Sequence, residues 1–326
     1  MHDFWMIQQT KKEGEDVFSI NPVVGECNDS RINEICNRVV GEKELYQALE
    51  QADTDFAEGD IGAGTGTICY GLKGGIGSAS RTLVLDGKTY TIGVLVQSNF
   101  GATRDLKISG KPAGEKILER IRKEECGSSA EDRGSIMTVL ATDLPVSERQ
   151  LYRIIRRCGV GIARTGAYTG HGSGEIMIGF TTANRVDTKS TCEVEACARI
   201  KEEKINEAFE AAAEAVEEAI LNSMVTAREK RGLDGARYRS LAEFLEIPGF
   251  RNKSSFQNHT PQFGNFTSTF CAVYDEITGV REFAEYGAQG RFGYKGFSVG
   301  QSVFDSPGGL LLDASIRKKE PDIEGR

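Results

Sequence analysis

Residues 170–180 read GHGSGEIMIGF, a glycine-rich turn that runs directly into an apolar strand. Glycine adopts backbone angles that other residues avoid, and it leaves its neighbours uncovered. Ser173 therefore stands at the start of a strand with bare backbone on both sides, where a reacting carbonyl group can approach it. The same arrangement lets the peptide bond between Gly172 and Ser173 bend toward the Ser173 hydroxyl.

Apolar runs on both sides of this turn have the length and composition of β-strands. They predict strands over residues 81–85, 89–97, 135–141 and 176–182. The Asp86-Gly87 pair between the first two runs is a strong hairpin signal. Residues 91–96 are almost wholly apolar, which is typical of a strand buried on both faces.

Long helices are interspersed with these strands. Apolar positions at helical spacing predict helices over residues 42–52, 147–158 and 201–228, and Ser147 is a candidate N-cap for the second. In the third helix an apolar stripe runs from Ile205 to Met224, and the opposite face carries small alanines that suit close packing. Strands buried on both faces and interspersed with helices indicate an α/β fold, in which helices cover sheet layers.

The composition changes after about residue 235, where Asn, Gln, Ser, Phe and Gly become frequent. We therefore divide the chain into one domain over 1–250 and a C-terminal segment over 251–326 with no assigned role. Within that segment, residues 266–274 and 279–285 are predicted to form a hairpin across Asp275-Glu276.

Composition excludes several classes of function. The 326 residues carry a net charge of −8 and the pI is near 5.2, which argues against nucleic acid or an anionic membrane as the main partner. No apolar run approaches the roughly 20 residues that span a bilayer. Eight cysteines lack CxxC pairs and there are only three histidines, so we expect no metal and no other cofactor.

Cysteine usage and the N-terminus also bear on the compartment. Scattered free thiols are typical of a reducing cytoplasm, and the N-terminus lacks the basic start and apolar core of a signal peptide. We therefore expect a cytoplasmic protein.

The glycine-dense loop GDIGAGTG, residues 59–66, differs from a phosphate-binding loop. It follows no predicted strand, it lacks a following Gly-Lys-Ser/Thr, and it contains the acidic Asp60. A structural loop, or one wall of an active site, is the better interpretation. Lys73 and Arg81 in the next glycine-rich segment could bind a carboxylate, although a lone basic side chain is more often a solvated charge.

Ser173 lacks a convincing histidine partner. His171 is only two residues away, and His2 and His259 lie in poorly structured contexts. A serine whose peptide bond has been cut would instead carry its own α-amino group, whose pKa of about 7.7–8.0 suits a general base at neutral pH. A turn residue without chemistry is the plain alternative for this serine.

Three ordered motifs resemble the DmpA family of self-processing serine aminopeptidases, which includes β-peptidyl aminopeptidases. The first is GTGTICYGLKGGIGSASR over residues 64–81, and the second is IGVLVQSNFG over 92–101. The third runs from GIARTG at 161–166 through GSGE at 172–175 to FTTAN at 180–184. The resemblance covers roughly residues 18–230, and the chain lacks the longer N-terminal segment that precedes Phe18 in the family.

The resemblance implies a four-layer α/β/β/α fold like that of N-terminal-nucleophile hydrolases, with a different connectivity. It implies cleavage between Gly172 and Ser173 into two chains that stay together. The activity implied is release of N-terminal residues from short peptides, amides or esters through an acyl-enzyme, by a homotetramer.

The resemblance also assigns roles to individual residues. Ser173 is nucleophile and base, Tyr70 helps to stabilise the oxyanion, and Asn99 is a further candidate donor. Glu218 orients the new amino terminus, and Glu58 holds the amino group of the substrate.

Two other interpretations stay open. Where the family usually has a hydroxyl residue two places before the glutamate, this chain has Val216, which favours a non-catalytic binding protein of the same fold. An acyl transferase like the ornithine acetyltransferases ranks lower, because that family has threonine at the cleaved bond.

Overall fold

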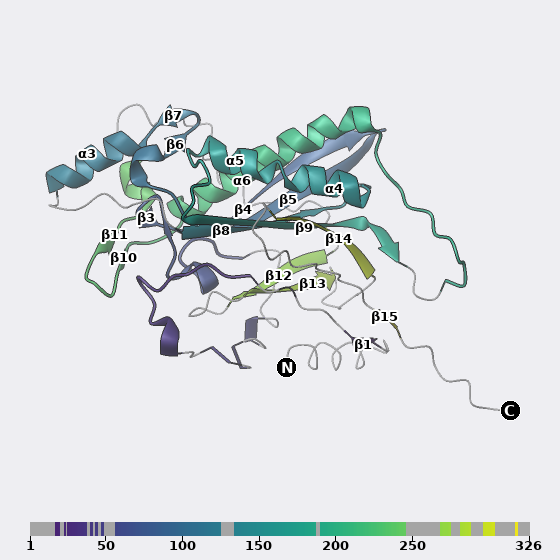
Figure 1. Ribbon diagram of the computed structural model, residues 1–326, viewed down its shortest axis with the longest axis horizontal. Coiled ribbons are helices and arrows are strands. Elements are labelled where there is room, and N and C mark those ends of the chain that lie inside the picture. The colour runs from purple at the N-terminus through teal and green to yellow at the C-terminus, as the bar shows by residue number, and fades with distance from the viewer. Residues whose placement is uncertain are drawn as a thin grey trace.

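The computed structural model describes residues 56–124, 134–186 and 190–245 without interruption, with shorter pieces inside 17–48 and four strands between 268 and 318. A five-stranded mixed sheet forms its centre (Figure 1). Its strands, in spatial order, are β14 (Gly296–Val303), β9 (Ser173–Val186), β8 (Gly134–Thr142), β5 (Lys88–Asn99) and β4 (Gly75–Leu85). Strands β8 and β9 are parallel, whereas the other neighbours are antiparallel.

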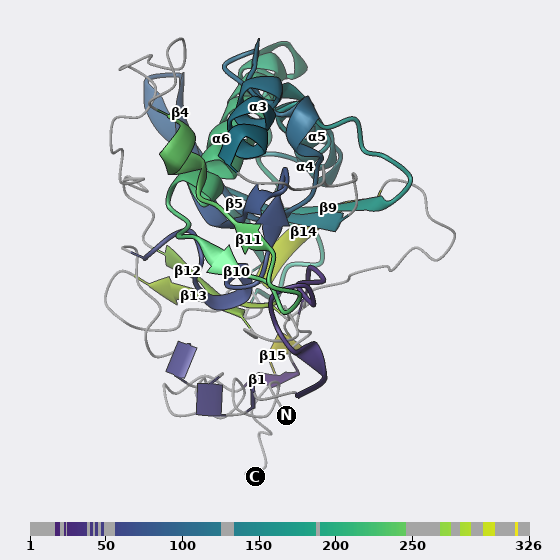
Figure 2. The same ribbon diagram turned by 90° about the vertical axis from the view of Figure 1, so that its left-hand side faces the viewer.

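Helices α4 (Glu148–Ile155), α5 (Cys158–Arg164) and α6 (Ile205–Val225) cover one face of this sheet (Figures 1 and 2). Helix α3 (Gly114–Glu124) extends beyond the end of the sheet and packs against the 3-10 helix at Thr103–Asp105. On the opposite face lies the antiparallel pair β12 (Ser268–Tyr274) and β13 (Arg281–Gly287). The described residues thus supply an outer helix layer, the sheet, and strands on the other side of the sheet.

The remaining described elements are short strand pairs and 3-10 helices. The two-stranded pairs are β1 (Val17–Ser19) with β15 (Arg317–Lys318), β2 (Ile68–Cys69) with β3 (Leu72–Lys73), β6 (Lys107–Ile108) with β7 (Lys111–Pro112), and β10 (Lys230–Arg231) with β11 (Arg237–Tyr238). The 3-10 helices are η1 (Ile35–Asn37), η2 (Gly62–Gly64), η3 (Thr103–Asp105), η4 (Glu202–Lys204) and η5 (Leu241–Phe244).

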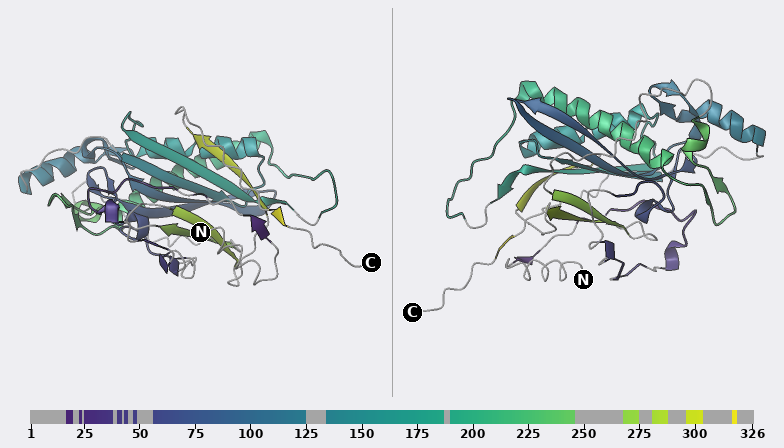
Figure 3. Two further views of the ribbon diagram at one scale, coloured as in Figure 1. Left: turned by 60° about the horizontal axis from the view of Figure 1, so that its bottom comes forward. Right: turned by 180° about the vertical axis from the view of Figure 1, so that it is seen from behind.

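Both hairpins predicted from the sequence are confirmed. Asp86 and Gly87 both have positive φ and close the β4–β5 hairpin, in which Leu85 pairs with Lys88. The hairpin predicted in the C-terminal segment is present as β12–β13, and β14 from the same segment pairs with β9 at one edge of the sheet (Figure 3). The helix predicted over 42–52 lies largely outside the described residues.

The helix predicted over 147–158 is in fact two helices. Ser147 caps α4 as predicted, because its hydroxyl accepts a bond from the Gln150 N–H and the Gln150 side chain accepts one from the Ser147 N–H. Helix α4 ends at Ile155, and α5 starts at Cys158. The break redirects the chain, so that α5 packs against α6.

Helix α6 is buried on two sides, which explains both its apolar stripe and its alanines. Val216 packs on Gly161 of α5, where a glycine Cβ would lie 2.7 Å from the valine Cβ. On the β4 side, a Cβ at Gly77 would lie 2.0 Å from the Ala219 carbonyl oxygen. The core therefore lies between the sheet and the helices, and glycines set how closely α6 approaches both neighbours.

No helix in the described part of the chain is both long enough and apolar enough to cross a membrane.

We predict that Gly77→Ala lowers the free energy of unfolding by about 1–3 kcal/mol, because the added methyl group pushes α6 away from β4. Urea unfolding followed by circular dichroism measures the change. Gly41→Ala is the control, since a Cβ there meets nothing closer than 3.6 Å. Equal unfolding midpoints for the two variants would contradict the close packing.

Candidate functional site

Ser173 is partly exposed, and it is the first residue of β9, which begins three residues before the strand predicted over 176–182. Its N–H donates to the Gly170 carbonyl at 2.9 Å, which closes the turn. Its Oγ donates to Glu175 Oε1 at 2.7 Å. Residues two apart in a strand point to the same face, so the serine and this carboxylate stand side by side.

The carbonyl of Gly172 has a hydrogen-bond donor. Gly134 lies opposite Ser173 in the parallel β8–β9 pair, and its N–H donates to the Gly172 oxygen at 3.2 Å. Gly134 has φ +145, and a Cβ there would lie 1.8 Å from the Asn99 carbonyl oxygen. This position therefore requires glycine. The bond between Gly172 and Ser173 thus has the serine hydroxyl on one side and a backbone donor on its carbonyl.

Asn99 ends β5 at the same end of the sheet, where it pairs with Ser135. Its side chain is buried and holds two backbone groups: Oδ1 accepts from the Ile68 N–H and Nδ2 donates to the Asn28 carbonyl, both at 2.9 Å. This amide thus fixes the strand end and the β2 segment.

Tyr70 lies at this end too, fully buried. Its hydroxyl is 2.8 Å from Thr165 Oγ1, which donates to the Ile162 carbonyl, so the tyrosine is the donor in the pair. Its N–H donates to the carbonyl of Phe100, the residue after Asn99. Ser173, Asn99 and Tyr70 therefore belong to one end of the sheet.

The two predicted glutamates lie elsewhere, close to each other, between β4 and α6. Glu58 Oε1 accepts bonds from the N–H of Ser78 at 2.6 Å and from its hydroxyl at 2.5 Å. Burial raises the pKa of Glu58, the two bonds from Ser78 oppose the rise, and the charge of Glu218 adds to it. Burial and the charge of Glu218 thus disfavour the charged form of Glu58.

Glu218 forms an ion pair with Arg81, whose Nη1 lies 2.7 Å from Glu218 Oε2. The same guanidinium contacts Glu214 Oε2 through Nε at 2.9 Å. Arg81 is therefore a bridge between β4 and α6. It binds carboxylates, as one of the two interpretations expects, but they belong to this chain, and it is not a lone solvated charge.

The structure does not bring Ser173 and Glu218 together. Strand β9 is separated from β4 by β8 and β5, and three strand spacings amount to about 14 Å across the sheet. Val216, which stands where the family has a hydroxyl residue, points into the contact with α5 and is fully buried. The structure thus holds two separate polar groups, one around Ser173 and one around Glu58 and Glu218.

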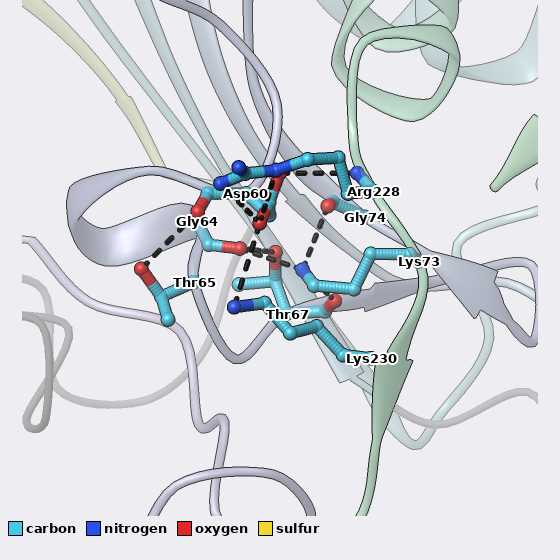
Figure 4. A network of polar contacts seen from close by, with 8 residues as sticks. All are labelled: Asp60, Gly64, Thr65, Thr67, Lys73, Gly74, Arg228 and Lys230. Carbon is cyan, nitrogen blue, oxygen red and sulfur yellow. Dashed lines mark hydrogen bonds and ion pairs between the residues drawn. The ribbon is translucent and has the colours of Figure 1, made fainter. Parts of the chain in front are cut away.

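The loop over residues 59–66 is held by Lys73, as Figure 4 shows. Lys73 is buried, and its ammonium group donates to the carbonyls of Gly64, Thr67 and Gly74 at 2.7–2.8 Å. Three acceptors match the three N–H donors of an ammonium group. The expectation that Lys73 is solvated is therefore wrong: the chain folds back so that its own carbonyls replace water.

Asp60 ties the same loop to the segment after α6 (Figure 4). It accepts bonds from the N–H and the guanidinium of Arg228 and lies 3.5 Å from the Lys230 ammonium. Burial alone raises the pKa of Asp60, but the bonds and the charge of Arg228 outweigh it and lower the pKa. These contacts support a structural role for the glycine-dense loop.

We predict that Lys73→Met lowers the free energy of unfolding at pH 9 by about 1–3 kcal/mol, because the carbonyls around Lys73 lose the side-chain nitrogen that donates to them. Burial lowers the pKa of Lys73 from 10.5 to about 7. Between these values the unfolded chain binds more protons, so Lys73 makes wild-type stability rise with pH from about 7 to 10. The variant should lack that rise. Urea unfolding at several pH values measures both effects.

Lys107→Met, at an exposed position, is the matched control and should leave the pH dependence of stability unchanged. Identical pH dependence in wild type and Lys73→Met would show that the ammonium group keeps its ordinary pKa in the fold.

Three residues at the site escaped prediction from the sequence. Glu175 was within reach, because its spacing of two from Ser173 on a strand places both on one face. Gly134 and Thr165 become neighbours of the site through pairings far along the chain, which no local pattern signals. In the described ranges, no three His, Cys, Asp or Glu side chains gather as a metal-binding group would.

The model of the family described as peptidase family S58 matches residues 3–238. The chain is 38% identical over 224 residues to a curated protein named beta-peptidyl aminopeptidase BapA from Sphingosinicella microcystinivorans. That match covers 66% of this chain and 57% of the relative. The chain thus spans little more than half the length of this relative.

Two solved structures share the fold. The Burkholderia sp. beta-aminopeptidase is 34% identical with a TM-score of 0.65, and the match covers 76% of this chain and 71% of the other. The L-aminopeptidase D-Ala-esterase/amidase from Ochrobactrum anthropi is 36% identical with a TM-score of 0.59, covering 65% and 58%. The latter is described as a variant of the N-terminal-nucleophile hydrolase fold. The fold class predicted from the resemblance is confirmed.

Proposed function

The chain belongs to peptidase family S58, and we propose that it is a self-processing serine aminopeptidase that is cut between Gly172 and Ser173. The observation that carries the proposal is the arrangement at that bond. The Ser173 hydroxyl is hydrogen-bonded to a carboxylate, and the Gly172 carbonyl accepts a backbone N–H. A nucleophile and an oxyanion donor at one peptide bond are what acyl transfer requires.

After the cut, Ser173 carries a free α-amino group that serves as general base for its own hydroxyl. The hydroxyl oxygen attacks the carbonyl of a bound peptide, amide or ester, and its proton passes through the amine to the leaving group. Water then releases the acyl group from Ser173 by the reverse sequence. No cofactor is needed, because the chain supplies both nucleophile and base.

We assign Tyr70 and Asn99 to the oxyanion on the basis of the resemblance and of their place at the same end of the sheet. Glu58 receives the amino group of the substrate. Burial raises the pKa of Glu58, and a bound ammonium group would favour its charged form. Glu218 receives the amino group of Ser173. Since Glu218 lies near β4, this last role requires the freed end to move across the sheet after the cut.

The substrates we propose are short peptides, amino-acid amides or esters with a free amino group, which suits the acidic chain. The compartment we propose is the cytoplasm, and the assembly is a homotetramer, as the resemblance implies.

A non-catalytic binding protein is the second candidate. The engaged states of Tyr70 and Asn99, together with the burial of Val216, favour it. A chain that stays uncut in solution distinguishes it from the proposed enzyme.

We predict that the purified protein consists of two fragments, residues 1–172 and 173–326, and that Ser173→Ala stays a single inactive chain. Intact mass and N-terminal sequencing measure the cut. Ser190→Ala, at an exposed position, is the matched control and should be cut like wild type. A wild-type protein that remains one chain and releases nothing from amino-acid p-nitroanilides would overturn the proposal.

We predict that Glu58→Gln raises the KM for an amino-acid p-nitroanilide by about 10- to 100-fold, because a charge-assisted bond to the substrate amine is lost. Steady-state kinetics on the cut enzyme give kcat and KM separately. Glu193→Gln, at an exposed position, is the control. A fall in kcat with an unchanged KM would assign Glu58 to a step after binding.

A further inference from the structure

The first cut poses a chemical problem that the mature enzyme does not have. The α-amino group of Ser173 is part of the Gly172–Ser173 peptide bond until that bond breaks, and an amide nitrogen is no base. A hydroxyl has to lose its proton to attack a carbonyl efficiently. Self-processing therefore needs a proton acceptor that is present in the uncut chain.

We infer that Glu175 is this acceptor, and that it acts as the general base of the first cut. The inference rests on the proposed self-processing at Gly172–Ser173. Glu175 Oε1 already accepts the hydroxyl hydrogen bond of Ser173 at 2.7 Å, within the range for proton transfer. The carboxylate is partly buried. Because its hydrogen bond to the serine is already formed, it needs no rearrangement to reach the proton.

The geometry of the strand fixes this contact. Ser173 and Glu175 are two residues apart in β9, and β9 pairs with β8 from its first residue, Gly134 opposite Ser173. Their side chains therefore leave the same face of a paired strand. His171 lies before the bond to be cut, in the exposed part of the turn. The strand thus presents the carboxylate, rather than the imidazole, to the hydroxyl.

The carbonyl of the bond to be cut has a hydrogen-bond donor of its own. The Gly134 N–H donates to the Gly172 oxygen at 3.2 Å, and this donor is fixed by the β8–β9 pairing. A backbone donor aimed at a carbonyl oxygen stabilises the negative charge that develops there in a tetrahedral intermediate. Acceptor, nucleophile and oxyanion donor are thus all in place before the cut.

The proposed step is balanced within the chain. Ser173 Oγ bonds to the Gly172 carbonyl carbon while its proton moves to the Glu175 carboxylate. The carbon–nitrogen bond then breaks, Glu175 returns the proton to the Ser173 nitrogen, and an ester links Gly172 to Ser173 Oγ. Water hydrolyses the ester, which leaves a Gly172 carboxylate and a Ser173 residue with a free amino group and a free hydroxyl.

The test follows cleavage of the full chain after a pulse of cell-free synthesis. We expect Glu175→Gln to slow the appearance of the 1–172 and 173–326 fragments by about 10²-fold, the usual contribution of a general base. Glu175→Asp should be intermediate. Glu193→Gln, an exposed control with the same chemical change, should match wild type. In wild type, hydroxylamine should convert the ester to a Gly172 hydroxamate, detected by mass.

Chemical rescue separates a base from a structural contact. Glu175→Ala should be cut slowly, and added formate or acetate should restore cleavage in proportion to its concentration. Circular dichroism melts check that the variants are folded. A Glu175→Gln chain cut at the wild-type rate, or a folded Glu175→Ala chain that small carboxylates leave unaffected, would overturn the inference while self-processing stands. An uncut wild-type chain would overturn self-processing itself.

Discussion

The parallel pairing of β8 with β9 is the contact on which the candidate site depends. It joins residues about 40 positions apart and sets Gly134 opposite Ser173, so that a backbone N–H meets the Gly172 carbonyl. A shift of one residue in this register would turn Ser173 and Glu175 to the other face of the sheet and remove the donor from the carbonyl. Gly134 also faces β5 on its other side, where its approach to the Asn99 carbonyl leaves no room for a side chain. One strand pairing therefore places the Ser173 hydroxyl, its carboxylate partner and the hydrogen-bonded Gly172 carbonyl together.

The packing of α6 plays the corresponding role for the second polar group. The helix can bring Glu218 toward Arg81 only because Gly77 lets the Ala219 carbonyl approach β4. The opposite side of the helix is closed by Gly161 and Val216. The Val216 side chain is therefore part of the core. A hydroxyl group at this position would be buried against α5 and would need a hydrogen-bond partner. The substitution that separates this chain from the family pattern thus stabilises the helix contact.

The sequence predicted what local chemistry controls and missed what distant pairing creates. The Asp86-Gly87 turn and the Ser147 cap depend on a few adjacent residues, and both are present. The strand predicted over 176–182 is present as well, but β9 extends over Ser173–Val186 because its pairing with β8 begins at Ser173. Lys73 was misjudged because its three carbonyl acceptors surround it only after the loop over 59–67 folds back. Gly134 could not be identified from the sequence, since its hydrogen bond to the Gly172 carbonyl depends on the pairing of β8 with β9. The division at residue 250 and the roles carried over from the family stay predictions.

Under the proposed self-processing, the chain described here corresponds to the precursor. Its serine is bonded to a carboxylate and not to an amine, and Glu218, the residue proposed to hold that amine, is paired with Arg81 three strands away. Under the proposed self-processing, Arg81 would have to share Glu218 with the new amino terminus, and its ion pair with Glu214 would remain. The proposal therefore gives Ser173 two bases in turn: the Glu175 side chain, which the strand fixes, and then its own amino group.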